Sequence, residues 1–559
     1  MSHNPGTATA ARPRHPSAFE PLTLVVTVLL SGLGAVIGIV LITSLGVACN
    51  TAVIGALVAM LLGRIPVAAL SGMRDRHRQN LVQSAVSGAT FGAANSLILP
   101  ISVPFLLGRS DLVWPMLGGA VIGLAVDSWV LYRVFDSRLL PASGAWPPGV
   151  AAAQTIEAGD QGGRKAKVLG IGAVAGVAGS LYGLPMSAAG VAFLGNAWAL
   201  GMFGLGLLIA QYAPALTHTD LYAAYIPHGL MIGAGTVALI QALLLLRTRP
   251  DPGPAADTRH DSNGTDSRQA PPGHTFSPDV RTVTEKRLRR GFTEGLALFT
   301  AGAALVALLG GITTRMPPIA VAGWILLAGV AALVHQLIVG LAAMHSGWFP
   351  AFAVTLIFLL LGLLLHLPPL ALALLVGYVA ATGPAFADMG YDLKAGWLLR
   401  ADTRPWLPCE QAGRRQQYLS QLIGFAIALT AVALLWQPLF SQGRLPPLAK
   451  VYTATIDTGL GDSTDLLRMF LWAIPGAAIQ LIGGTGRQMG VLLATGLLVA
   501  APHAGWLVLA ALTVRAAHHT LTRRTGKTAE TGDETLVLLG AGLIAGSSLH
   551  DITRVRDAL

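Results

Sequence analysis

Two aspartates spaced four residues apart are the residues best suited to chemistry in this sequence. Asp388 and Asp392 lie in the segment GPAFADMGYDLKAGW, directly after a long apolar run. Residues four apart share one face of a helix, and two close carboxylates disfavour simultaneous ionisation. Such a pair is suited to taking up and releasing a proton. The alternative is a charge cluster at a helix end, with Lys394 at the cytoplasmic edge, and spacing alone leaves both interpretations open.

Other ionisable residues also occur within apolar segments. A charged side chain in hydrocarbon costs about 2.5 to 3.5 kcal/mol on insertion scales, so each one needs a reason. Asp127 in VIGLAVDSWVLY and Glu294 in GFTEGLALF are further candidates for proton coupling or gating. The alternative for both is contact with water, because each lies within a turn or two of an expected span end. His335 in AALVHQLIVG is more typical of a hydrogen-bonded core histidine.

Motifs of soluble enzymes are missing from the sequence. HExxH, GxSxG and clustered Cys/His sets do not occur, and Leu521 stands where a Walker A loop ending at Gly526 would need glycine. The Asp388 to Asp392 spacing is similar to the magnesium-diphosphate motif of membrane prenyltransferases, but no second acidic motif is evident. We therefore expect no enzyme, metal site or cofactor, and a prenyltransferase-like enzyme is the least favoured alternative.

The composition is that of a membrane protein. Of 559 residues, 53% are hydrophobic and 11% are charged, and the mean hydropathy is +0.62. Residues 21–63, 168–219 and 316–387 contain no Asp, Glu, Lys or Arg. A bilayer core takes about 20 apolar residues per helix, so each block must cross more than once. The net charge of +10 comes from basic residues in short loops, which indicates cytoplasmic loops rather than nucleic-acid binding.

The expected fold is all-α and polytopic, with roughly 14 to 16 transmembrane or re-entrant helices. A cytoplasmic tail (1–20), a first membrane half (21–246), a disordered cytoplasmic linker (247–290), a second half (291–549) and a C-terminal tail (550–559) follow in order. The expected membrane segments are 22–46, 50–70, 81–107, 113–135, 168–186, 188–213, 222–246, 291–312, 318–343, 349–366, 367–387, 416–440, 468–485, 488–502, 503–519 and 535–549.

Two segments are expected to depart from simple spans. Three crossings between Lys167 and Arg247 would put the basic linker outside, so a segment within 168–199 is expected to be re-entrant or split near Pro185. Residues 81–107 combine Gly and Pro with the polar residues Gln83, Ser84, Ser87, Asn95 and Ser96. We interpret this segment as a broken or re-entrant helix lining a polar cavity. The alternative is a kinked packing helix whose polar residues join neighbouring helices.

Three motifs resemble the oligopeptide transporter superfamily, which includes the yellow-stripe-like metal-chelate transporters. The first is D-x-x-x-D-L-K-(T/S)-G followed by a Gln-rich helix start. The second resembles P-(F/Y)-P-E-G-T-A-x-A-E-x-(L/I)-x-A-G and the third N-x-x-Q-T-x-x-S. The matching residues are Asp388, Asp392, Leu393, Lys394, Gly396, Gln417 and Gln421 for the first motif, Pro147, Gly149, Ala151, Ala153, Ala158 and Gly159 for the second, and Asn80, Gln83, Ser84 and Ser87 for the third.

The resemblance implies about 16 membrane helices and proton-coupled symport of oligopeptides or peptide-like metal chelates. Its partners would be the substrate, protons and the lipid bilayer, without nucleic acid, and homo-oligomers are compatible with it. We expect a bacterial inner (plasma) membrane and a cytoplasmic N-terminus. The expected proton-coupling residues are Asp388, Asp392, Lys394, Asp127 and Glu294, and the expected pathway residues are Gln83, Ser84, Ser87, Asn95, Gly149, Gly396, Gln417 and Gln421.

The chain departs from the family pattern at several positions. Pro148 replaces a glutamate, and Val150 and Ala395 replace hydroxyl residues. The insertion PWLPCEQAG before Arg414 is expected to lengthen a cytoplasmic loop. These changes favour a divergent member with a different substrate. A channel or scaffold-like membrane protein that no longer pumps is the main alternative function.

Overall fold

Apolar runs form helices throughout the chain. The computed structural model describes residues 15–45, 52–161, 163–221, 223–247, 281–347, 350–403, 405–459, 463–498, 503–525 and 529–558. Within these ranges the protein is all-helical and has no strand, which confirms the expected fold class. The first 14 residues, Cys49, most of the expected linker (248–280) and the GKT segment (526–528) lie outside the described residues.

The helices pack around two main hydrophobic cores. The first core is built by α1 (Pro21–Leu45), α3 (Arg76–Phe91), η2 (Gly92–Ile98), α4 (Leu99–Leu106), α5 (Val113–Val134), α11 (Glu285–Leu309), α12 (Pro318–Ser346), α14 (Pro369–Ala380), α15 (Pro384–Leu399) and α16 (Trp406–Ser441). The second core is built by α6 (Pro147–Gln161), α7 (Gly163–Leu181), α8 (Met186–Leu194), α9 (Ala197–Thr217), α10 (Ile226–Arg247), α18 (Ser463–Arg487), α19 (Met489–Leu498), α20 (Ala504–Thr525) and α21 (Ala529–Ala558).

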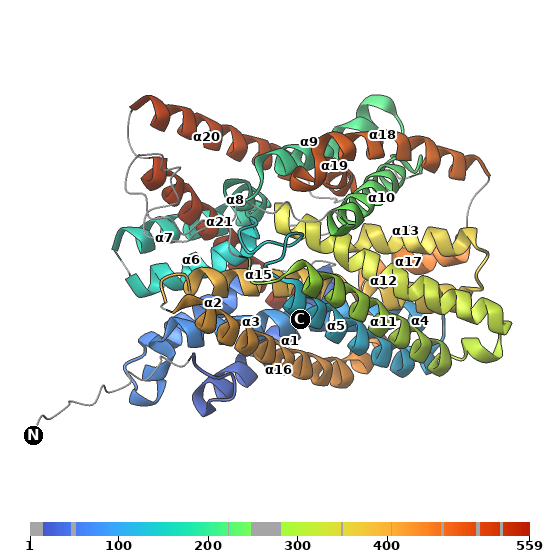
Figure 1. Ribbon diagram of the computed structural model, residues 1–559, viewed down its shortest axis with the longest axis horizontal. Coiled ribbons are helices and arrows are strands. Elements are labelled where there is room, and N and C mark those ends of the chain that lie inside the picture. The colour runs from blue at the N-terminus through green and yellow to red at the C-terminus, as the bar shows by residue number, and fades with distance from the viewer. Residues whose placement is uncertain are drawn as a thin grey trace, which may run out of the picture.

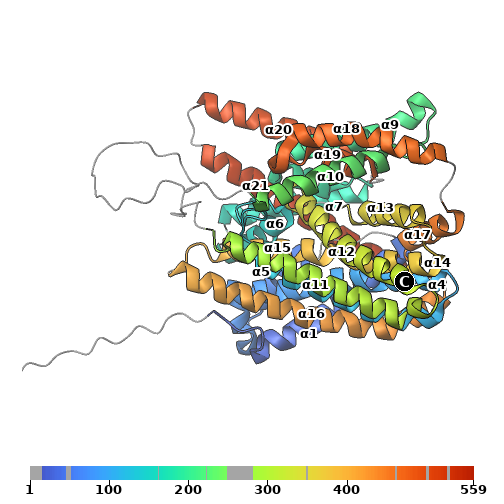
Figure 2. The same ribbon diagram turned by 45° about the vertical axis from the view of Figure 1, so that its right-hand side comes forward.

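Each half of the sequence contributes to both cores. The first core takes residues from 35–146 and 283–445, whereas the second takes most of its residues from 151–238 and 491–545. In Figures 1 and 2, α9, α10, α18, α19 and α20 form a layer on one side, and α1, α11 and α16 lie on the other, with α12 between them. The remaining helices are α2 (Ala52–Arg64), α13 (Ala351–Leu364), α17 (Pro447–Thr458) and the short 3₁₀ turns η1 (Ala68–Arg74), η3 (Ser110–Leu112) and η4 (Ile312–Thr314).

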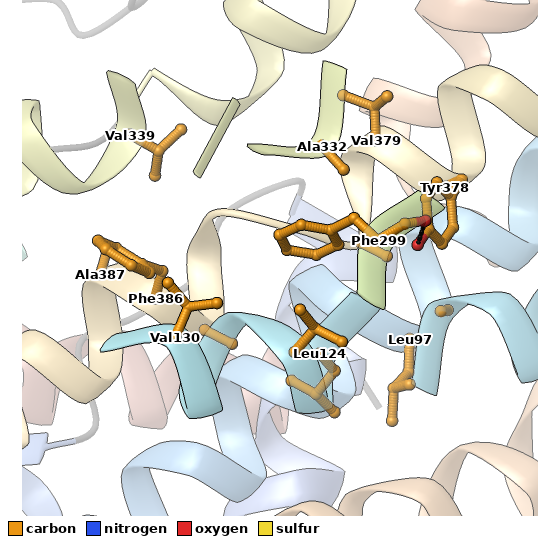
Figure 3. Packing of buried hydrophobic residues seen from close by; sticks show 14 of the residues in the cluster. Leu97, Leu124, Val130, Phe299, Ala332, Val339, Tyr378, Val379, Phe386 and Ala387 are labelled. Carbon is orange, nitrogen blue, oxygen red and sulfur yellow. Dashed lines mark hydrogen bonds between the residues drawn. The ribbon is translucent and has the colours of Figure 1, made fainter. Parts of the chain in front are cut away.

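Large side chains from several helices fill the first core. In Figure 3, Phe299 of α11 lies between Phe386 of α15 and Tyr378 of α14, and Val130 of α5 lies close by. The Tyr378 hydroxyl donates a 2.8 Å hydrogen bond to the carbonyl of Phe299. This contact satisfies the phenol inside an apolar region.

Nine helical segments of the described residues are long and apolar enough to cross a membrane. The chain is therefore a multi-pass membrane protein. Two of the segments, Arg76–Leu106 and Pro369–Leu399, are the most enclosed, since 89% and 94% of their most apolar stretches are buried inside the protein. These two segments lie within the bundle rather than against lipid.

The prediction of a broken or re-entrant helix in residues 81–107 is wrong. Helices α3, η2 and α4 run on without interruption, and η2 is a π-helical segment. A π-helical turn absorbs an extra residue without ending the helix. Pro100 directly follows this π-helical segment, and Pro104 lies one turn further along the same helix. The polar residues of this segment therefore lie along a continuous helix.

Two other expected spans are interrupted. The split near Pro185 is confirmed, because α7 ends at Leu181 and α8 begins at Met186. Residues 188–213 are not one span, because α8 ends at Leu194 and Asn196 caps the start of α9 by accepting hydrogen bonds from Trp198 N and Ala199 N. Residues 367–387 are not one continuous helix either, because α14 ends at Ala380 and α15 begins only at Pro384.

Some segments expected to be loops or tails are helical. The insertion at 405–413 is not a lengthened loop, because it forms the first turns of α16 from Trp406. The basic residues at 286–290 belong to α11 rather than to the linker, and the C-terminal tail continues α21 to Ala558. Helix α6 at 147–161 and helix α17 at 447–458 were not among the expected membrane segments.

Glycines allow α7 and α21 to pack with their backbones in contact. A Cβ on Gly176 would lie 2.5 Å from the Leu543 carbonyl oxygen and 3.0 Å from Gly546 Cα. A Cβ on Gly170 of the same helix would meet no atom within 4 Å. Small residues at such crossings provide van der Waals packing that replaces the hydrophobic driving force in a membrane.

We expect Gly176→Ala to destabilise the detergent-purified protein, because the methyl group must push α7 away from the α21 backbone. Overpacking of this kind costs about 1 to 3 kcal/mol. Gly170→Ala, the same change in open space on the same helix, should leave thermal unfolding unchanged or slightly improved. Equal melting temperatures for the two variants would contradict the close crossing of α7 and α21.

Candidate functional site

The two aspartates lie in the interior on α15. Asp388 and Asp392 are both 0% exposed, and Lys394 is 5% exposed. The alternative of a solvated charge cluster is therefore wrong. Helix α15 starts after Gly383, whose φ of 87° suits glycine, and Pro384 occupies its first position. This break turns the end of an apolar run into a separate buried helix.

Polar side chains of α3 and α16 surround the two carboxylates. Ser87 Oγ donates to Asp388 Oδ1 and Gln83 Nε2 donates to Asp392 Oδ1, each at 2.5 Å. Gln421 Nε2 lies 3.1 Å from Asp388 Oδ2 and 3.3 Å from Asp392 Oδ2. The amide of Gln421 therefore bridges the two carboxylates. The structure thus gathers five of the residues that the sequence singled out.

A second layer of hydrogen bonds fixes these donors. Gln417 Nε2 donates to the carbonyl of Asp392 at 2.6 Å and to Ser84 Oγ at 3.2 Å. Its Oε1 accepts from Arg400 Nη1 at 2.9 Å, so the orientation of the amide is set from both ends. A Cβ at Gly396 would collide with Gln417 Oε1 and Arg400 Nη1. Glycine is needed there for α15 and α16 to approach.

No ion pair joins Asp388 or Asp392 to a basic side chain in the part of the chain that the structure describes. Lys394 instead donates to the carbonyl of Ala142 at 2.8 Å and lies 4.7 Å from the centre of the Trp397 ring. The carboxylates are thus held by neutral donors. Two negative charges without a basic partner would be costly at this depth.

Helix α6 brings the second core against the aspartate-bearing helix. A Cβ at Gly149 would collide with the Tyr391 carbonyl oxygen and would lie 2.9 Å from Lys394 Cβ. Only a glycine allows this contact between α6 and α15. The aspartate pair therefore lies on a helix that packs against both cores.

The other sequence candidates lie at different places. Asp127 Oδ2 accepts hydrogen bonds from the backbone N–H groups of Gly383 and Phe386, so it caps α15. Asn95 lies in η2, which packs against α5, α15 and α16. Glu294 is 31% exposed and pairs with Arg290 and Arg133 at 2.5 and 3.4 Å. The structure does not bring Glu294 to the aspartate pair.

Sequence reasoning missed a buried charge cluster beside the aspartate pair. Arg400 and Glu410 are both fully buried and pair at 2.8 Å, and Arg414 pairs with Glu410 at 3.1 Å. Arg414 also donates to the Phe135 carbonyl and to Thr282 Oγ1, each at 3.0 Å. The inserted segment supplies Glu410, so the insertion provides the countercharge for two buried arginines.

A spacing signal for this cluster was present in the sequence. Asp388, Asp392, Gly396 and Arg400 recur every four residues on α15. Their α16 partners Gln421, Gln417 and Glu410 follow at spacings of four and seven residues in the opposite direction. The pattern predicts two facing helices. The Arg400 cluster was overlooked in the sequence, because basic residues near membrane spans usually lie in solvated loops.

The N-terminal segment packs over the end of α3 and α16. Arg78 Nε donates to Glu20 Oε2 at 2.7 Å, and Ala18 N donates to Gln416 Oε1 at 2.9 Å. The rings of His15 and His77 lie 5.0 Å apart. Burial, and then the positive charge of Arg400, lower the pKa of His15 to about 4. His15 is therefore neutral at pH 7.

The sequence pattern of a known family matches almost the whole chain. The family described as OPT oligopeptide transporter protein matches residues 21–245 and 210–553. The chain belongs to the OPT oligopeptide transporter family. No curated protein and no solved structure matches it. The OPT family is a family of transporters rather than of enzymes, and no group of three or more His, Cys, Asp or Glu side chains in the described residues could hold a metal ion.

We expect Glu410→Gln to destabilise this OPT protein, because the change leaves two buried arginines without a countercharge. Removing one partner of a buried ion pair costs about 3 to 5 kcal/mol. Thermal unfolding of the purified protein, followed by fluorescence-detected size exclusion after heating, measures the effect.

Asp402→Asn is the matched control, the same chemical change in an exposed pair. Asp402 lies 2.5 Å from Arg76 and its side chain is 58% exposed. Partial burial raises its pKa, but the hydrogen bond and charge of Arg76 outweigh this effect and lower it. An exposed pair contributes about 0 to 1 kcal/mol, so the control should unfold close to the wild type. Equal losses in both variants would contradict the burial of Glu410.

Proposed function

We propose that this OPT protein is a secondary active transporter that couples proton movement to symport of oligopeptides or peptide-like metal chelates. One observation carries the proposal. Two fully buried carboxylates, Asp388 and Asp392, share the amide of Gln421 and have only neutral hydrogen-bond donors. Two close carboxylates in this setting disfavour holding two negative charges, so the pair takes up one proton and releases it when water or substrate enters.

The hydrogen-bond donors around the aspartate pair would also bind the substrate. Gln83, Ser87 and Gln421 each donate to a carboxylate oxygen in the present arrangement. When a carboxyl group is protonated, one of its oxygens becomes a donor while the other still accepts, so the donor that faced the protonated oxygen must rearrange. Groups released in this way can hydrogen-bond a peptide backbone. Ser84, Asn95, Gly149, Gly396 and Gln417 complete the proposed pathway along α3, η2, α6, α15 and α16.

Movement between the cores would open this site. Helix α15 contacts α6 of the second core at Gly149, and Lys394 donates to Ala142, in the segment that leads into α6. Separation of α6 from α15 would free the Lys394 ammonium for the carboxylate of a peptide or chelate. Transporters commonly bind substrate between two bundles that rock against each other. Asp127 would keep the start of α15 in place during this movement through its hydrogen bonds to the backbone.

The proposed location is the plasma membrane of a bacterium. Arg74, Arg76 and Arg78 lie next to the α3 start, and Arg76 pairs with Asp402, which follows α15, so basic residues gather at this end of the bundle. Basic residues remain on the cytoplasmic side of membranes. The N-terminus, whose residues 15–20 pack at this end, would therefore face the cytoplasm.

Uptake by proteoliposomes tests the proposal. Purified protein is reconstituted and given a mixture of short peptides and iron or nickel chelates, with and without an inward proton gradient, and the contents are identified by mass spectrometry. We expect gradient-dependent accumulation of an unchanged peptide or chelate. Equilibration without accumulation would indicate a channel, and a chemically altered product would indicate an enzyme. Either result would contradict the proposal.

We expect Asp388→Asn and Asp392→Asn to abolish gradient-driven accumulation, because each removes one of the two carboxylates that share the proton. The loss should be tenfold or more, which is about 1.4 kcal/mol or more. Asp111→Asn, in an exposed pair with Arg109 at 2.6 Å, is the control and should transport normally. Wild-type transport rates and wild-type pH dependence in both variants would contradict the assignment of proton coupling to Asp388 and Asp392.

A further inference from the structure

The turn between α14 and α15 holds a second buried carboxylate whose bonding is incomplete. Asp127 of α5 is 0% exposed. Its Oδ2 accepts from Gly383 N and Phe386 N, at the start of α15. Its Oδ1 is buried and has no hydrogen-bond partner. A helix N-terminus thus satisfies one oxygen of this carboxylate, and the other remains available.

Oxygen acceptors surround the same turn. Pro384 has no N–H, so the carbonyl of Ala380 lacks the helical partner four residues on. Thr382 Oγ1 donates to the Val379 carbonyl at 2.8 Å and lies 3.2 Å from His335 Nδ1, so at least one of its two lone pairs remains able to accept. Thr382 also lies against α5, since a Cβ on Gly123 would be 3.2 Å from Thr382 Cγ2. Gly123 is one helical turn before Asp127, so Thr382 packs against the same stretch of α5.

The nearest basic side chain is already engaged. His335 of α12 packs against Gly383, because a Cβ on that glycine would be 2.7 Å from His335 Nδ1. His335 Nε2 is 2.9 Å from the Ala351 carbonyl, which can only accept, so Nε2 carries a proton. Nε2 also lies 3.1 Å from Thr355 Oγ1, and Nδ1 lies 3.2 Å from Thr382 Oγ1. No hydrogen bond joins the imidazole to Asp127 in the described structure.

Other titratable groups around α5 are also accounted for. Tyr378 of α14 donates to the Phe299 carbonyl. Asp388 of α15 is held by Ser87. Glu294 of α11 pairs with arginines at the surface. None of these contacts supplies a positive charge to Asp127.

The geometry of the break points to a small cation as the missing partner. The C-terminal end of α14 carries a partial negative charge, and the N-terminal end of α15 carries a partial positive charge. Asp127 Oδ2 meets the positive end. Its unpartnered Oδ1 faces no donor in the described structure, and the C-terminal end of α14 and the Thr382 hydroxyl supply oxygen acceptors to the same break. Interrupted membrane helices bind Na⁺ or H⁺ at breaks of this kind.

We propose that the break between α14 and α15 binds one monovalent cation, H⁺ or Na⁺, through Asp127 Oδ1. Because α15 also carries Asp388 and Asp392, occupation of this break would set the position of the aspartate pair. The proposal deepens the proposed function by naming a site for a coupling cation. The role of this cation in transport rests on the proposed function, whereas the binding of the cation does not.

A binding experiment without transport tests the proposal. Purified protein carrying both Asp388→Asn and Asp392→Asn is used, so that the pair cannot titrate. Its melting temperature is measured in NaCl and in choline chloride at equal ionic strength, across a pH series. The same series is run with Asp127→Asn added. This variant keeps an oxygen that can accept from Gly383 and Phe386, so α15 keeps its cap.

Two results support the proposal and distinguish the two cations. A saturable rise of melting temperature with NaCl, lost in Asp127→Asn, assigns Na⁺, since a ligand that binds only the folded state raises its stability. A rise on acidification in choline chloride that is insensitive to NaCl and lost in Asp127→Asn assigns H⁺. Responses to Na⁺ and pH that are the same with and without Asp127→Asn overturn the proposal.

A second variant keeps the test decisive if Asp127→Asn does not fold. Thr382→Val keeps the side-chain shape but removes the hydroxyl oxygen. For Na⁺ we expect its half-saturating concentration to rise severalfold, and for H⁺ we expect the acid response to shift in pH. An unchanged response in both series overturns the proposal. A cation response in a protein that transports nothing would contradict the proposed function and leave this site standing.

Discussion

The shared amide of Gln421 is the interaction on which the arrangement of this OPT protein depends. It bridges Asp388 and Asp392 inside the bundle, where no basic side chain of the described structure reaches them. Neutral donors must therefore offset the loss of water, because a buried polar group without a partner is costly. This requirement fixes three helices together. Helix α15 presents the acids, and α3 and α16 must present their polar faces at the same level.

The rest of the fold supplies this alignment through close backbone contacts and buried charge. Gly396 allows Gln417 to reach α15, and Gly149 allows α6 to lie against it. Arg400 orients the Gln417 amide and is neutralised by Glu410 from the inserted segment. Since buried charges must be paired, the insertion and the two arginines form a unit. The insertion therefore contributes to the interior rather than to a surface loop.

Local patterns in the sequence predicted the elements and much of the site. Four-residue spacing placed the aspartates on one face, and the family motifs pointed to Gln83, Ser87 and Gln421. Periodicity could not predict which helices face each other. The start of α15 is capped by Asp127, more than 250 residues earlier in the chain, and α3 continues into α4 through a π-helical turn. Hydrophobic periodicity predicts neither feature. The Arg400 cluster was missed because the sequence alone does not distinguish a basic residue in a solvated loop from one in a buried ion pair.

The central claim is that substrate and proton cross this OPT protein together. The most direct measurement uses proteoliposomes that contain a pH-sensitive dye, with no proton gradient imposed, and adds a transported peptide or chelate outside. Coupling through Asp388 and Asp392 predicts acidification of the interior only when substrate is present, at a rate proportional to substrate uptake. Uptake of substrate with no movement of protons would contradict it.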